Sequence, residues 1–203
     1  MSDPTAPEAI AAESWRRVRA ATDLSGVPSD LVPVAVRMVH ACGVPEIVAR
    51  LAWRPGVMRA ARDALTGGAP VVVDCRMLDA GVVRARLPAA NLVECLLDAD
   101  GAGERAPGET RSAAAVTAAR DRLAGSVVAI GNAPTALDRL LTLIGEGMPP
   151  PAAIVGMPVG FVGAADAKAA LAHAQVPWLT LHGRMGGSAI AAAAVNALAG
   201  DVG

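Results

Sequence analysis

Three histidines are the side chains of this sequence best suited to proton transfer, because the imidazole ring titrates near neutral pH. His40 ends an apolar helical stretch and follows Arg37 by three residues, so the two side chains share one face of the predicted helix. His173 lies in an Ala-rich helical segment, which indicates a surface position. His182 directly follows a predicted strand and is either structural or close to a site. Spacing alone leaves both a catalytic and a structural role open for His40.

The histidines and cysteines do not form a pattern typical of a metal site. The histidines lack the four-residue spacing and the accompanying carboxylates of a zinc site. Cys42, Cys75 and Cys95 are odd in number and widely separated, which fits neither a disulfide framework nor a Cys-x-x-Cys motif. We therefore expect no bound metal and three reduced thiols that act as small buried hydrophobic residues.

Three loops rich in glycine and proline follow predicted strands and precede predicted helices. They are Gly131–Leu137, Gly156–Val162 and Gly183–Ser188. The start of a helix presents free N–H groups that bind anions, although tight-turn geometry alone also explains each loop. Three such loops at one sheet edge favour a ligand site there. No Gly-x-Gly-x-x-Gly, Gly-x-x-x-x-Gly-Lys-[Ser/Thr] or Gly-x-Ser-x-Gly motif occurs, which disfavours nucleotide cofactors and a serine nucleophile.

Short apolar runs alternate with helical segments over the last two thirds of the chain. This alternation predicts a parallel sheet covered on both faces by helices. We predict one α/β domain over residues 1–203, with a doubly wound parallel sheet of about five strands and a helical N-terminal portion. The strands are expected at residues 70–74, 92–97, 126–130, 152–155 and 178–181. N-terminal helices are expected at Glu8–Ala21 and Leu31–Ala41, from Pro45 through Ala52, and up to Leu65, and Asp98–Glu109 is expected to be a loop.

The amino-acid composition limits the kinds of molecule that this protein can bind. The hydrophobic fraction is 53% but aromatic residues make up only 2%, so the core must consist of Ala, Val and Leu. The net charge of -1 leaves no basic stripe for a nucleic acid. No run of about 18 uncharged apolar residues occurs, and the first 14 residues include three acidic ones, so we expect no membrane association and a cytoplasmic protein.

Five motifs together resemble the precorrin-8X methylmutase family, and the resemblance extends from about Ile10 to Leu198. The motifs are Arg37–Gly43, Thr110–Ala113, Gly125–Leu137, Gly156–Val162 and Gly183–Ser188. The resemblance implies a 1,5-shift of a methyl group from C-11 to C-12 of precorrin-8X, which gives hydrogenobyrinate. In the cobalt branch of cobalamin biosynthesis it implies conversion of cobalt-precorrin-8 to cobyrinate. It also implies a homodimer and no organic cofactor.

The resemblance also assigns roles to residues. The histidine of the Arg-x-x-His motif, His40, is implied as the proton donor and acceptor, and Ser14 and Arg37 as substrate contacts. Arg111 and Arg184 match arginines expected at the same pocket. These residue types suit the chemistry, because a proton makes the conjugated macrocycle electron-poor and guanidinium groups recognise its carboxylates.

Departures from the family pattern and rival functions bear on this interpretation. Val83 stands where relatives can carry a hydroxyl residue, Ala167 replaces a frequent serine, and the N-terminal stretch lacks a tyrosine found in many relatives. The alternatives are a phosphate-using α/β enzyme, opposed by the missing signatures, and a corrinoid carrier, opposed by the presence of His40. The segments Arg37–Gly43 and Arg84–Pro88 are more similar to the metal-free branch.

Overall fold

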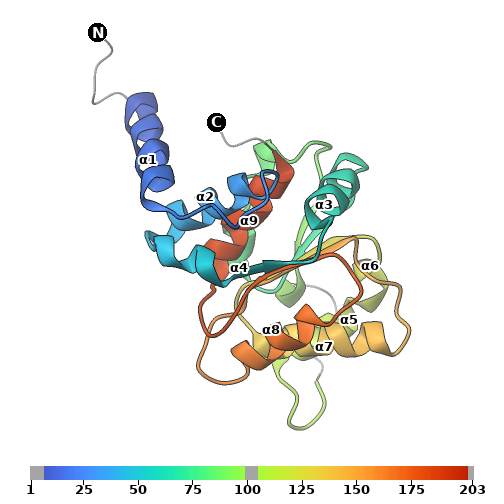
Figure 1. Cartoon of the computed structure of the whole chain (residues 1–203). Helices are drawn as coiled ribbons and strands as arrows, with labels where there is room; N and C mark the ends of the chain where they lie inside the picture. The colour runs from blue at the N-terminus through green and yellow to red at the C-terminus, as the bar shows by residue number, and fades with distance from the viewer. Residues whose placement is uncertain (1–6, 99–104, 201–203) are drawn as a thin grey trace.

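A six-stranded sheet forms the centre of the molecule. The computed structural model describes residues 7–98 and 105–200 (Figure 1). The strand order is β1-β6-β5-β4-β2-β3, and all neighbours are parallel except β1 and β6. Its strands are β1 (Leu51–Trp53), β2 (Val71–Val73), β3 (Val93–Cys95), β4 (Val127–Ile130), β5 (Ala153–Gly156) and β6 (Trp178–Leu181). All five strands predicted from the apolar runs are therefore present, in a parallel arrangement.

The central strands are buried on both faces. Every residue of β2, β4, β5 and β6 is buried, as expected for parallel strands between two layers of helices. Alternate residues point to opposite faces, so Val127 and Ala129 join one apolar cluster while Val128 and Ile130 join the other. The predicted α/β sheet with helices on both faces is confirmed.

Helices are divided between the two faces, as Figure 1 shows. One face carries α2 (Val32–Cys42), α3 (Val57–Thr66), α4 (Arg76–Gly81) and α9 (Ser188–Ala199). The other face carries α5 (Arg111–Ala118), α6 (Arg120–Leu123), α7 (Pro134–Gly145) and α8 (Ala164–Ala172). Helix α1 (Pro7–Ala21) lies outside both layers, contacts α2, and contains no fully buried residue. Three short 3-10 helices complete the described elements: η1 (Pro45–Arg50), η2 (Arg84–Arg86) and η3 (Leu96–Asp98).

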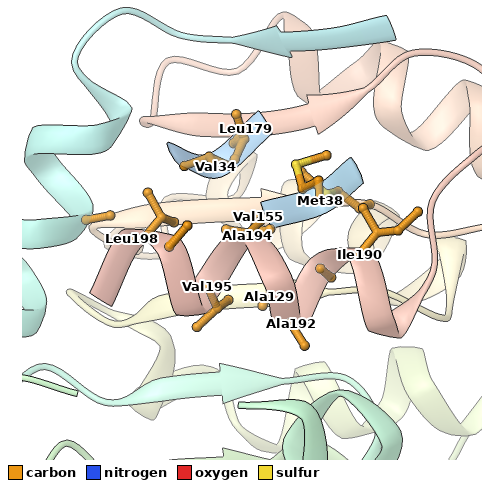
Figure 2. Close-up of a cluster of buried hydrophobic side chains, with 14 of the residues drawn as sticks. Val34, Met38, Ala129, Val155, Leu179, Ile190, Ala192, Ala194, Val195 and Leu198 are labelled. Carbon is orange, nitrogen blue, oxygen red and sulfur yellow. The ribbon is translucent and has the colours of Figure 1, made fainter. Parts of the chain in front are cut away.

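Helix α2 is fixed to the sheet through α9. Val34 and Met38 of α2 share an apolar cluster with residues of α9 and of the central strands (Figure 2). The α9 helix consists mostly of alanine, and ten of its residues are buried, which allows α2 to pack closely on it. Gly43 ends α2 with a left-handed φ of 69°, and its amide donates to the carbonyl of Val39. The exposed end of α2 therefore has a defined position.

The helix predicted from Pro45 through Ala52 is wrong. The structure has the 3-10 helix η1 there, followed by β1, whose Leu51 pairs with Leu181 of β6. The apolar residues of this segment suit either a helix or a strand. Residues 51–53 form a strand because they pair in antiparallel orientation with the edge of β6. The predicted loop Asp98–Glu109 is described only in part, because residues 99–104 lie outside the described ranges. Within those ranges, no helix is long and apolar enough to cross a membrane.

Candidate active site

Helices α1 and α2 bring His40 together with two residues of the N-terminal helix. The Oγ atom of Ser14 lies 3.1 Å from Nδ1 of His40. The Trp15 ring stacks on the imidazole with a centroid distance of 4.2 Å and an interplanar angle of 30°. His40 itself is exposed. Because Ser14 occupies Nδ1, the other ring nitrogen, Nε2, is the one that can exchange a proton with a ligand.

Arg37 lies one helical turn before His40 on the same face of α2. Its guanidinium carbon is 5.3 Å from the centre of the Trp15 ring, within the range of a cation–π contact. Its Nε and Nη2 atoms are buried and have no hydrogen-bond partner among the described residues. Burial lowers the pKa of Arg37, and the nearby positive charge of Arg86 lowers it further. A half-buried cation with unused donors is costly unless an anion compensates it.

A pocket of about 330 Å³ opens beside His40. Ser14 and Val18 of α1 and Val39 and His40 of α2 contribute to its lining. A larger hollow of about 560 Å³ adjoins it and shares the lining residues Ala21 and Pro45. This hollow is lined by two carboxylates, Asp23 and Glu46, and by neither His40 nor Ser14. Those carboxylates would repel an anionic ligand, so the smaller pocket is the candidate active site. No group of three His, Cys, Asp or Glu side chains that could hold a metal ion occurs among the described residues.

One of the three predicted anion-binding loops is already occupied by a side chain of the protein. Asp74, buried after strand β2, accepts hydrogen bonds from the amides of Gly131 (3.0 Å), Asn132 (2.8 Å) and Ala133 (2.8 Å). These amides directly precede α7, and they are the ones expected to be free. The expectation that these N–H groups are free to bind an anion is therefore wrong, because the carboxylate of Asp74 accepts their hydrogen bonds.

The other two glycine-rich loops lie side by side at the carboxyl ends of β5 and β6. The amide of Gly160 donates to the carbonyl of Arg184, and the amide of Gly187 donates to the carbonyl of Met157. The exposed guanidinium of Arg184 lies over the ring of Phe161, with 4.8 Å between its carbon and the ring centre. These loops precede α8 and α9, whose N-caps, Gly163 and Gly187, have no capping side chain.

The predicted site residues thus fall into separate groups. Ser14, Arg37 and His40 are brought together by α1 and α2. Arg184 has Phe161 as its neighbour. Arg111 is exposed at the start of α5, where the capping residue is Thr110. The expectation that Arg111 and Arg184 join Arg37 in one pocket stays a prediction.

Two residues in contact with the site or its supporting loops were not predicted. Trp15 stacks on His40, and its only sequence signal is an aromatic residue next to Ser14 in a chain with three tryptophans. Lys168 is fully buried, and its Nζ atom donates to the carbonyl of Met185. Of the three departures from the family pattern, two are substitutions at described positions: Val83 is exposed and its amide donates to Asn196 Oδ1 (2.8 Å), while Ala167 is buried in α8. Neither contacts the residues around His40 in the interactions described.

Comparison with known proteins identifies this arrangement. The family model of precorrin-8X methylmutase matches residues 9–200. The precorrin-8X methylmutase of Pseudomonas aeruginosa is 50% identical over 95% of this chain and 94% of its own length. The cobalt-precorrin-8 methylmutase of Priestia megaterium is 32% identical over 95% of this chain and 87% of its own length. The crystal structure of precorrin-8X methylmutase from Thermus thermophilus superimposes with a TM-score of 0.88 at 39% identity, covering 95% of this chain and 94% of that one.

These matches extend over the whole α/β domain and include both α2 and the glycine-rich loops. Fold and sequence together define a methylmutase, an isomerase that moves a methyl group within its substrate. The chain belongs to the precorrin-8X methylmutase family of cobalamin biosynthesis.

Proposed function

We propose that this enzyme shifts a methyl group from C-11 to C-12 of metal-free precorrin-8X to form hydrogenobyrinate, with His40 as the proton donor and acceptor. The observation that supports this most directly is the imidazole held by Ser14 and Trp15 in the lining of a pocket, one helical turn from Arg37, whose Nε and Nη2 atoms have no hydrogen-bond partner in the described part of the chain. A proton delivered to the macrocycle withdraws electron density from the conjugated system and eases migration of the methyl group. The same imidazole takes the proton back after the shift.

The other predicted residues orient His40 or bind the substrate. Ser14 holds Nδ1 of His40 and so orients the ring. Arg37 binds a carboxylate of the substrate once movement of the surrounding side chains uncovers its Nε and Nη2 atoms, which are buried and have no hydrogen-bond partner among the described residues. Arg111 and Arg184 present exposed guanidinium groups for further carboxylates. The reaction is an isomerisation with no net change in electrons, so no organic cofactor or redox partner is required.

The metal-free substrate is supported by similarity. Over most of both chains, the Pseudomonas aeruginosa relative, which is named for precorrin-8X, is 50% identical to this chain, whereas the Priestia megaterium relative, which is named for cobalt-precorrin-8, is 32% identical. We expect purified enzyme to convert precorrin-8X with a higher kcat/KM than cobalt-precorrin-8, as measured by the visible spectrum of the corrin formed. Carbon-13 NMR of the product methyl group provides the control for its position. Equal or better use of the cobalt substrate would contradict this proposal.

The proposed working unit is a homodimer in the cytoplasm. Phe161 and Val162 are 86% and 89% exposed at a loop tip, a position in which a partner subunit would remove apolar surface from water. The three free cysteines agree with a reducing compartment. Light scattering is expected to give twice the monomer mass, with an interface above roughly 1,000 Å² of total buried area. A monomer that stays fully active at nanomolar concentration would refute the requirement for a dimer.

A further inference from the structure

The loop that carries Arg184 packs against the loop between β5 and α8. Besides the two backbone hydrogen bonds that join them, Gly186 packs directly on the backbone of the β5–α8 loop. A Cβ atom at Gly186 would lie 2.3 Å from the carbonyl oxygen of Met157 and 2.8 Å from that of Pro158. Only glycine fits such an approach without a backbone shift. The Gly183–Gly187 loop is therefore built to hold one conformation.

Lys168 of α8 also contacts the loop that carries Arg184. Its side chain is fully buried in α8, and Nζ donates to the carbonyl of Met185 at 2.5 Å, directly after Arg184. No carboxylate forms a salt bridge with Lys168 among the described residues. Burial lowers the pKa of Lys168 to about 8. The fold thus places a poorly solvated amine under this loop, where an apolar side chain would have packed at a lower cost.

At position 168, lysine suits the single described acceptor better than arginine would. Lys168 is the single lysine among the 18 lysine and arginine residues of the chain. An ammonium group on a flexible stem reaches end-on to a single carbonyl, whereas the planar guanidinium fork needs several acceptors around it. A buried charge of this kind is weak evidence for a role in stability. Its one described acceptor instead connects it to the loop that presents Arg184.

We propose that Lys168 is a positioning residue that holds the Met185 carbonyl, fixes the Gly183–Gly187 loop and thereby directs Arg184 toward a carboxylate of the substrate. This inference rests on the proposed role of Arg184 in binding. Lys168 acts through Arg184 and makes no contact with the reacting atoms. Its loss therefore weakens binding of substrate and product but leaves the chemical step unchanged.

A double-mutant cycle tests this dependence. Lys168→Met, Arg184→Ala and the double variant are titrated with hydrogenobyrinate, and Kd is measured by visible absorption. We expect Lys168→Met to raise Kd about five- to tenfold in the wild-type background and by less than about twofold in the Arg184→Ala background. The kcat for precorrin-8X is expected to stay within about twofold of wild type. Leu171→Met, a volume-conserving change in the same helix, is the control and should leave Kd unaltered.

Amide hydrogen exchange gives a second readout that does not depend on Arg184. The amides of Gly160 and Gly187, which join the two loops, are expected to exchange faster in Lys168→Met. Should that variant fail to fold, Lys168→Gln, which keeps a neutral donor, takes its place in the cycle. Equal effects of the Lys168 variant in both backgrounds, or unchanged exchange at both glycines, would overturn the positioning role. If Arg184→Ala alone leaves Kd unchanged, the proposed role of Arg184 fails, a result distinct from additivity in the cycle.

Discussion

Replacement of His40 with alanine is expected to lower the rate of methyl migration by at least about a hundredfold, the low end for general acid–base catalysis. The variant should still fold, because His40 is exposed at the end of α2 and the core side of the helix consists of other residues. It should also bind the tetrapyrrole, because Arg37 and the other residues that line the pocket remain. Single-turnover conversion of precorrin-8X, followed by visible absorption, separates the chemical step from binding.

The matched control for this experiment is His173→Ala. His173 is exposed beyond the end of α8, and its removal should leave turnover unchanged. Circular dichroism of both variants checks that helix content is retained. Near-normal turnover in His40→Ala would remove His40 from the mechanism, although membership of the methylmutase family would stand.

Replacement of Arg37 with methionine is expected to change binding and stability in opposite directions. Hydrogenobyrinate should bind about ten- to a hundredfold more weakly, because a charge-assisted hydrogen bond contributes about 1.5–3 kcal/mol. The ligand-free protein should be at least as stable as wild type, because the substitution removes a partly desolvated cation with two buried donors that have no hydrogen-bond partner within residues 7–98 and 105–200. Titration by visible absorption measures the first effect, and thermal unfolding without ligand measures the second.

Arg19→Met provides the comparison for this substitution. Arg19 is an exposed arginine on α1, so the same loss of one positive charge there should change neither quantity appreciably. A lower melting temperature of ligand-free Arg37→Met would mean that Arg37 supports the fold. In that case Arg37 would have a structural role. The weaker binding of Arg37→Met could then not be attributed to the loss of a contact with a substrate carboxylate.

Most of the fold was predictable because burial leaves a clear pattern in the sequence. Runs such as Val71–Val73 and Val127–Ile130 are apolar throughout, which is what a strand buried on both faces requires. Strand β1 was not predictable, because its three residues continue an apolar stretch that equally suits a helix. Its conformation depends on the free edge of β6, which is distant in sequence and supplies the partner for Leu51.

From residue spacing alone, the candidate site was predictable only where its residues are close in sequence, and Ser14 was assigned to it through the family resemblance. The three-residue spacing of Arg37 and His40 placed them on one helix face, and the structure has both beside Trp15. The contact of α1 with α2 joins residues 26 positions apart, and no periodicity specifies it. The same applies to Asp74, which fills the start of α7 from a different strand. Free N–H groups at a helix start can be inferred from sequence, but their occupation by a distant carboxylate cannot.

A chain with a single, buried lysine has practical consequences for labelling. Amine-directed dyes and cross-linkers ordinarily react with lysines on the surface, and Lys168 is the only lysine that this sequence offers. Such reagents should therefore leave the side chains of the folded protein largely unmodified. Conversely, a carbon-13 label at the Cε atom of lysine should produce one signal in an NMR spectrum. That signal arises from beneath Met185 and would report on the interior of the protein free of overlap from other lysines.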